Sequence, residues 1–535
     1  MERNGIGPTA GCGQPGFGVP DVVVVGAGAA GAVLAARLSE DADRRVLLLD
    51  AGPAPRSAHE FGTRLLDARL VPGAVSGQAQ VALWPVRLTS QRPWMVPRGR
   101  VLGGSTTVNG GYFVRARRED FDRWAAAGNP AWAYDRVLPH LRALENDLDY
   151  GASPVHGGSG PVPVRRGGLD HPAATAFRSA ASLLGYPEEP DKNDQAAPGF
   201  GPVPSNAVDG VRKNTALTYL GAEVRDRPNL RVLGESTVRR ILFAAGRATG
   251  VLIEHDGRLL TLDAGTVVVS AGALGSAHLL LLSGIGPRAD LERLGIPVVR
   301  DAPALGTRLS DHPQIALEWG NQDDWGEPRE SWLGGCLHLR LPGGTGTPAG
   351  PGDAEILQSL VPMAGLVAGT TAVPGAALPF LVSVLTPRPT GVMRLRSADP
   401  LAPADIDLGY LGTAEDRRRM REAVRAAAAL VETPPFTDRG PGLIEPGRAI
   451  LEDDDALDAW IHGHLGTAQH TCGTVPMGPE GDPDAVVDQY GRVHGVRGLR
   501  VADTSILPDA PHRGPAATAV LIGELVADAI RRCLP

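Results

Sequence analysis

The feature that most constrains the fold is a glycine pattern that directly follows an apolar run near the start of the chain. The run is Val22–Val25, typical of a buried strand, and the glycines are Gly26, Gly28 and Gly31, before residues suited to a helix. Such glycines permit a tight turn, the approach of a pyrophosphate to the backbone and close packing of the helix on the strand. The free N–H groups at the helix start then attract the phosphates. The sequence therefore predicts a dinucleotide-binding unit of strand, turn and helix.

An acidic residue after the next apolar run supports this prediction. Residues 46–49 are expected to form a second strand, and Asp50 follows it, about twenty residues beyond the glycines. A carboxylate at this place accepts hydrogen bonds from an adenosine ribose and disfavours a 2′-phosphate. The chain is rich in glycine, with 69 in 535 residues, so a chance glycine turn is the alternative interpretation. The pattern fits NAD and FAD equally well.

Length and charge exclude several other classes of protein. At 535 residues the chain is long enough for two or more structural units. Its formal net charge of −8 opposes binding to a phosphate backbone, so we expect no nucleic-acid partner. The sequence has no apolar run of the length that a signal peptide or a membrane span needs. We therefore expect a cytoplasmic protein without a transmembrane segment, and peripheral docking on a membrane-borne electron acceptor is compatible with this.

The cysteines give no sign of a disulfide framework or of a metal site. There are four of them, far apart and without the spacing of metal ligands: Cys12, Cys336, Cys472 and Cys533. We expect no bound metal, and this cysteine usage fits a reducing compartment.

Four segments together resemble the signatures of the glucose–methanol–choline (GMC) family of FAD-dependent oxidoreductases. Residues 98–109 (RGRVLGGSTTVN) resemble the first signature, and residues 266–287 resemble the second, with Ala277 where the family usually has proline. The segment that begins at His470 (HTCGTVPMG) resembles the family motif HxxGTxxMG, and residues 498–508 resemble its last strand. The segments follow the family's order along the chain. The resemblance covers essentially the whole chain and implies FAD rather than NAD.

The resemblance assigns FAD contacts to residues in each of these segments. It implies a loop that passes the flavin, an asparagine beside the isoalloxazine, a valine whose backbone holds the adenine, and an acid near the phosphate and ribityl groups. With the glycine turn, the predicted cofactor-binding residues are Gly26, Gly28, Gly31, Asp50, Gly103, Gly104, Ser105, Asn109, Val238, Ser270, Ala271, Asp503, Thr504 and Pro515. Some family members tether the flavin through a histidine, and Val108 stands at that position here. We therefore expect non-covalent FAD.

His470 is the predicted catalytic base. Alcohol oxidation moves a hydride from carbon and a proton from oxygen, and histidine is the side chain best matched to accept that proton near neutral pH. A buried structural histidine in a glycine turn is the alternative. The family usually has a second His or Asn where this chain has Gly514. The adjacent His512 and Arg513 are candidates for that role, with Arg513 as a fixed cation beside a developing alkoxide, but a solvent-facing loop explains both equally well.

The resemblance implies an α/β fold with two discontinuous parts. One is a Rossmann-like FAD-binding domain of the glutathione-reductase type, expected at residues 15–155, 211–310 and 465–535. The other is an α+β substrate-binding cap built on an antiparallel sheet, expected at residues 156–210 and 311–464.

The implied function is that of an FAD-dependent alcohol dehydrogenase that passes hydride from a CH–OH carbon to flavin N5. The first signature, Gly514 and the ending RGPAATAVLIGE resemble the mycofactocin-system subgroup. This implies oxidation of mycofactocinol to mycofactocinone, with electrons passing to a respiratory acceptor. Another primary or secondary alcohol, choline-like or aliphatic, is the alternative substrate. A non-redox hydroxynitrile lyase on the same fold and a non-catalytic flavin-binding protein are also compatible with a fold of this type.

Overall fold

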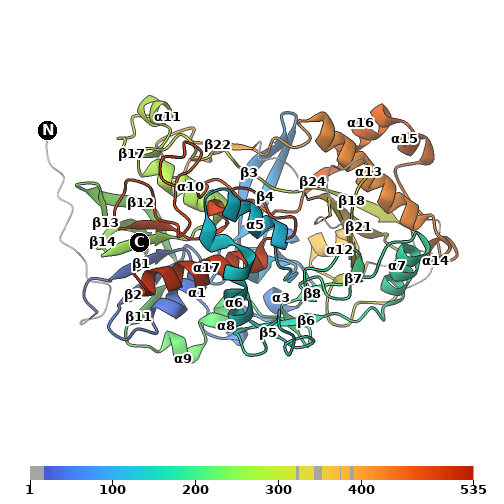
Figure 1. Cartoon of the computed structure of the whole chain (residues 1–535), viewed down its shortest axis with the longest axis horizontal. Coiled ribbons are helices and arrows are strands. Elements are labelled where there is room, and N and C mark those ends of the chain that lie inside the picture. Colours follow the sequence, from blue (N-terminus) through green and yellow to red (C-terminus); the bar gives the residue numbers. More distant parts are fainter. Residues whose placement is uncertain are drawn as a thin grey trace.

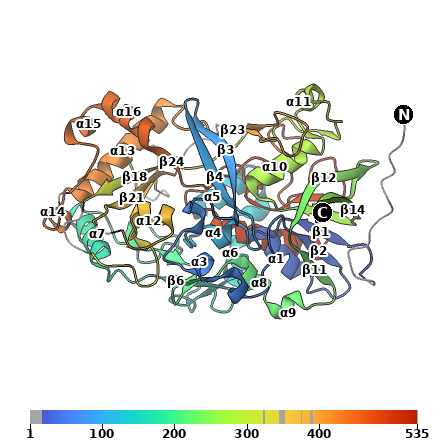
Figure 2. The ribbon, with the colours of Figure 1, turned by 180° about the vertical axis from the view of Figure 1, so that it is seen from behind.

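The computed structural model describes residues 17–320, 325–342, 352–373, 375–385, 391–440 and 442–533. A parallel sheet and an antiparallel sheet lie toward opposite ends of the longest axis of the molecule (Figure 1). The same arrangement is seen from behind, where the hairpin of β3 (Val81–Thr89) and β4 (Arg92–Gly99) rises between the two sheets (Figure 2). The predicted combination of a Rossmann-like part with a sheet-rich part is confirmed.

The parallel sheet contains the strand and helix that the glycine pattern predicts. Its order is β11 (Leu230–Leu233), β2 (Val46–Leu49), β1 (Val22–Val25), β15 (Thr266–Val269) and β25 (Leu499–Val501). Strands β1 and β2 are buried along their whole length, as expected where both faces of a parallel sheet are covered. Helix α1 (Ala29–Leu38) follows the turn after β1 and packs against α17 (Ala516–Arg531).

A three-stranded antiparallel sheet packs against β15. It consists of β12 (Ser236–Ala244), β13 (Arg247–His255) and β14 (Arg258–Asp263). Asp256 and Gly257 join the last two strands with φ of 50° and 70°. Positive φ at both central residues is the requirement of the tight hairpin turn that matches strand twist, and an Asp-Gly pair meets it at low cost.

The antiparallel sheet at the other end has six strands. Their order is β24 (Leu465–Thr467), β18 (Pro313–Trp319), β21 (Leu378–Val384), β20 (Ala354–Ser359), β19 (Leu333–Leu339) and β7 (Phe200–Pro202). Strands β19, β20 and β21 are buried at every residue, so both of their faces are covered. Helix α13 (Ala414–Val431) packs against this sheet.

A smaller sheet connects the two parts. It pairs β22 (Val392–Arg394), β23 (Asp405–Asp407), β3 (Val81–Thr89) and β4 (Arg92–Gly99). Arg87 on β3 forms ion pairs with Asp405 and Asp407 on β23. Strand β4 runs from this sheet toward the loop that contains Gly103 and Gly104.

The chain crosses repeatedly between the two large sheets. The proposed domain division assigns residues from 465 onward to the dinucleotide-binding part, whereas β24 pairs with β18 of the antiparallel sheet through Thr467. The last crossing therefore lies after Thr467, and the other boundaries stay predictions. No helix among the described residues is both long and apolar enough to span a bilayer.

Candidate active site

One cavity of about 410 Å³ reaches from the glycine turn to the antiparallel sheet. The turn after β1, the Gly104 loop, the turn after β15, the His470 loop and the residues before α17 all contribute to its wall. The predicted residues that line it are Gly26, Gly28, Asp50, Gly104, Ser105, Asn109, Ser270, Ala271, His470, Asp503, Thr504, Gly514 and Pro515. The cavity thus joins predicted cofactor residues to the predicted base.

Two glycines from distant segments face each other in this cavity. A Cβ atom on Gly104 would lie 2.7 Å from the Cα of Gly28, so the two backbones approach more closely than any side chain allows. A Cβ on Gly28 itself would have the Cα of Gly104 as its nearest neighbour, at 4.0 Å. The space beside Gly28 is therefore free within the protein, at the start of α1, where a pyrophosphate finds free N–H groups.

Gly31, Gly103 and Val238 lie outside the lining of this cavity. A Cβ on Gly31 would lie 1.8 Å from the carbonyl oxygen of Gly26, so Gly31 is required for α1 to pack against the turn. Gly103 has φ of +87°, which shapes the loop that carries Gly104. Val238 lies in β12, beside a register irregularity. The structure gives the two glycines structural roles, and the predicted adenine contact of Val238 stays a prediction.

Two buried carboxylates hold the loops around the cavity. Asp50 accepts hydrogen bonds from the backbone N–H of Ala27 at 2.9 Å and of Gly52 at 2.8 Å. Asp503 accepts from the N–H groups of Gly272 and Ser505, each at 2.9 Å. Burial raises the pKa of both carboxyl groups, and these donors oppose the rise. Each acid therefore fixes a turn where the sequence predicts contact with the dinucleotide.

His470 is held by a buried acid and a second histidine. Its backbone N–H donates to Asp311 Oδ1 at 2.6 Å, and Asp311 also accepts from the N–H of His312 at 2.7 Å. The Nδ1 atoms of His470 and His312 are 2.9 Å apart. A Cβ on Gly514 would lie 3.3 Å from His470 Nε2, so this nitrogen faces the cavity beside a residue that has no side chain.

The electrostatics favour a neutral imidazole at His470 before reaction. Burial lowers its pKa, and the charges of Asp311 and Glu355 oppose that shift. Burial and the neighbouring His470 lower the pKa of His312 to about 3, so His312 is neutral and can accept a hydrogen bond at Nδ1. With His312 as acceptor, His470 carries its proton on Nδ1 and leaves Nε2 free as a base. Asp311 and His312 were not predicted from the sequence, although the segment SDHP at 310–313 contains both.

The structure places His512 and Arg513 away from the cavity. The Nδ1 of His512 contacts Asp120, whose carboxylate also accepts from the backbone N–H of His512 at 3.0 Å. Arg513 is fully buried, donates to Glu189 at 3.1 Å and contacts the ring of His338. Neither residue lines the cavity. The predicted contact of either one with the substrate oxygen is therefore corrected, and so is the alternative of a solvent-facing Arg513.

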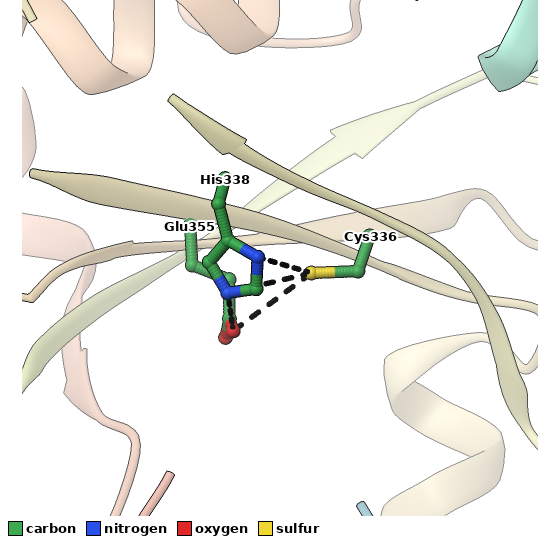
Figure 3. A group of neighbouring side chains, drawn as sticks. All are labelled: Cys336, His338 and Glu355. Atoms are coloured by element: carbon green, nitrogen blue, oxygen red, sulfur yellow. Dashed lines mark hydrogen bonds and ion pairs between the residues drawn. The ribbon is translucent and has the colours of Figure 1, made fainter. Parts of the chain in front are cut away.

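Two groups of buried side chains have the donor atoms that metal ions use. Cys336, His338 and Glu355 converge beside the cavity (Figure 3), and Glu145, Asp147 and His156 form the other group. Basic side chains already contact the donor atoms of both groups. Lys192 Nζ lies 3.2 Å from His338 Nδ1, and in the second group Arg115 pairs with Glu145 while Arg166 pairs with Asp147. Cys12 lies outside the described residues, and neither group argues for a bound metal.

Comparison with known proteins gives matches over nearly the whole chain. The family model described as GMC oxidoreductase matches residues 20–314 and residues 387–523. An uncharacterized GMC-type oxidoreductase of Rhodococcus erythropolis is 39% identical over 508 residues, which are 94% of this chain and 97% of that protein. An oxygen-dependent choline dehydrogenase of Rhizobium johnstonii is 34% identical over 95% of each chain.

A solved structure shares the fold as well as the sequence pattern. The crystal structure of pyridoxine 4-oxidase from Mesorbium loti matches with a TM-score of 0.87 and 28% identity, over 96% of this chain and 99% of that one. The family membership gives FAD as the cofactor, and the cavity at the glycine turn is where the predicted cofactor residues meet.

We expect Gly28→Val to abolish FAD retention while the chain still folds. The added side chain has free space within the protein but fills the place of the pyrophosphate. The flavin-to-protein absorbance ratio of the purified variant measures this. Gly167→Val is a suitable control, because Gly167 is exposed and a Cβ there meets no atom within 4 Å. Full flavin content in a folded Gly28→Val variant contradicts the assignment of this turn.

We also expect intact FAD to be released when the protein is denatured with acid. Val108 lines the cavity at the position of the tethering histidine and has no atom that can bond to the flavin. After centrifugation, the yellow colour should be in the supernatant, with the mass of FAD. Flavin that stays with the precipitated polypeptide shows that another side chain forms a covalent link.

Proposed function

The chain belongs to the GMC oxidoreductase family and is an FAD-dependent oxidoreductase that acts on CH–OH donors; we propose that it is an alcohol dehydrogenase with His470 as its catalytic base. The observation that carries the proposal is the position of His470 Nε2, which faces the cavity beside Gly514 without a competing side chain. The cavity also contains the glycine turn. A substrate at His470 would therefore lie in the same cavity as the bound cofactor, next to it.

The residues of this chain supply the proton chemistry. FAD, when bound, accepts the hydride from the carbinol carbon. His470 Nε2 takes the hydroxyl proton, and its Nδ1–H donates to His312 Nδ1 throughout, which holds the ring in one orientation. The imidazolium formed in this step is stabilised by Asp311 and Glu355, because both charges favour the protonated form of His470. Asp311 also fixes the backbone of both histidines.

For the substrate, we propose mycofactocinol, oxidised to mycofactocinone with electrons passing to a respiratory acceptor. The support is the resemblance of residues 98–109, of Gly514 and of the PAATAVLIGE ending to the mycofactocin-system subgroup. A cytoplasmic enzyme that docks on a membrane-borne acceptor belongs to this proposal. The second candidate substrate is a choline-like or aliphatic alcohol, which is supported by the similarity of the chain to an oxygen-dependent choline dehydrogenase.

Anaerobic titration with a panel of alcohols tests these proposals together. Loss of flavin absorbance with reduced mycofactocin, but not with choline or simple alcohols, supports the first substrate. Cyanohydrin cleavage without loss of flavin absorbance replaces the dehydrogenase proposal by the lyase.

We expect His470→Ala to retain FAD and to reduce the flavin at least about a hundredfold more slowly, because a positioned general base contributes this much. Anaerobic stopped-flow measurement of flavin reduction gives the rate. His59→Ala, at an exposed histidine, is the control. If His470→Ala reduces its flavin at nearly the wild-type rate, the base is another residue.

We expect the second-order rate constant of flavin reduction to fall on the acid side of a single ionisation. Burial lowers the pKa of His470, so the inflection should lie below the ordinary histidine value of about 6.5. The neutral ring is the active form, so the rate is full above the inflection and falls about tenfold per pH unit below it. A profile that instead rises as the pH falls contradicts a neutral His470 base.

A further inference from the structure

A row of polar side chains crosses the antiparallel sheet beside the cavity. The strand registers pair His338 on β19 with Glu355 on β20, Glu355 with Ser383 on β21, and Ser383 with Gln314 on β18. Glu355 and Gln314 line the cavity. The neighbouring cavity wall is mostly apolar and includes Trp332, Leu357, Met363, Leu366 and Leu381. A carboxylate in such a wall requires a specific partner.

Within the described residues, one oxygen of Glu355 accepts hydrogen bonds and the other does not. Its Oε2 accepts from His338 Nε2 at 2.9 Å and from the Tyr112 hydroxyl at 3.2 Å. Among the described residues no donor bonds to Oε1, although the residue is only 3% exposed. The carboxylate lies beyond the imidazole of His338 (Figure 3). Burial raises the pKa of Glu355, but the hydrogen bond from His338 outweighs this and lowers the pKa to about 2. The carboxyl group is therefore ionised.

The orientation of His338 is determined by the two cations beside it. Lys192 Nζ lies 3.2 Å from His338 Nδ1, and Arg513 Nη1 contacts both ring nitrogens, more closely at Nδ1. Both cations can only donate. Nδ1 is therefore the acceptor, and Nε2 carries the proton that it donates to Glu355 Oε2. His338 thus holds Oε2, and Oε1 is the oxygen of this cavity-lining carboxylate that has no donor among the described residues.

The charges behind Glu355 are balanced without a substrate cation. Glu189 pairs with Lys192 at 2.8 Å and with Arg513 at 3.1 Å, and all three side chains are fully buried. Glu355 supplies the second negative charge, against these two positive ones. Oε1 therefore needs a hydrogen-bond donor, whether charged or neutral.

We propose that Glu355 is a specificity residue, whose Oε1 accepts a hydrogen bond from a second N–H or O–H group of the alcohol substrate, away from the reacting carbon. The substrate class is that of amino alcohols, hydroxy amides and diols. This rests on the proposed dehydrogenase function, since it concerns the alcohol that enters the same cavity.

The test compares alcohols of matched length with the FAD-loaded protein. The probes are 1-pentanol, 5-amino-1-pentanol, 1,5-pentanediol and 5-methoxy-1-pentanol. Stopped-flow reduction gives rates, and perturbation of the flavin spectrum gives dissociation constants. The wild type should bind the amino alcohol or the diol at least about tenfold more tightly than the methoxy alcohol, because a hydrogen bond to a buried charge contributes this much. The amino alcohol and the diol distinguish a charged donor from a neutral one.

Glu355→Gln should reverse this preference. The amide oxygen must accept from His338 Nε2, so the NH₂ group turns toward the cavity and becomes a donor. The variant should then bind the methoxy alcohol more tightly than the amino alcohol, whose ammonium cannot accept this hydrogen bond. Flavin reduction should slow with all four alcohols alike, because the Glu355 charge that stabilises the His470 imidazolium is lost. Glu318→Gln, on β18 of the same sheet and outside the cavity lining, is the control and should keep the wild-type preference.

The measurements distinguish a wrong role for Glu355 from a wrong dehydrogenase function. If the wild type does not distinguish the four alcohols, or if Glu355→Gln binds FAD and keeps the wild-type preference, the role of Glu355 is wrong while the dehydrogenase function stands. If the preference is found in binding but neither these alcohols nor reduced mycofactocin reduces the flavin, Glu355 is supported and the dehydrogenase function is wrong. If the variant does not fold, the comparison of the four alcohols with the wild-type protein alone tests the role of Glu355.

Discussion

The close backbone contact between two glycine-containing loops is the constraint on which the site depends. The Gly104 loop lies against Gly28, and α1 lies against the turn through Gly31, in both places at distances that exclude a Cβ atom. Because these contacts are between main-chain atoms, they hold the loop positions independently of side-chain packing. The cofactor site is thus built largely from backbone, whereas the side chains of His470 and Glu355 line other parts of the same cavity.

Buried acids connect these backbone loops to one another. Asp50, Asp311 and Asp503 each accept hydrogen bonds from two backbone N–H groups, and in each case at least one donor is far away in the sequence. Burying a carboxylate is costly unless such donors satisfy it. The two donors of each acid offset this cost, and each acid thereby links two segments of the chain by hydrogen bonds. Asp311 holds His312 beside His470, because it accepts a hydrogen bond from the backbone N–H of each.

The parts of the site that sequence could predict are those carried by short contiguous patterns. The glycine turn, the Gly104 loop, His470 and the empty position Gly514 belong to such patterns, and they line one cavity. His512 and Arg513 were misplaced because neighbours of Gly514 need not share its direction, and tertiary contacts with Asp120 and Glu189 decide where they point. Glu355 could not be found, since it faces the cavity only through the register of an antiparallel sheet, and no short sequence pattern marks its position.

The fully buried ion pairs around Arg513 restrict how a substrate can reach the site. Arg513 adjoins Gly514 at the cofactor end, whereas Glu189 and Lys192 come from the long excursion between the two large sheets, and His338 comes from β19. Moving the two halves apart would separate these charges in a dry interior, and breaking a single buried pair costs about 3 to 5 kcal/mol. A hinge opening at each turnover is therefore disfavoured. Local side-chain motion that keeps Arg513 paired with Glu189 does not carry this cost.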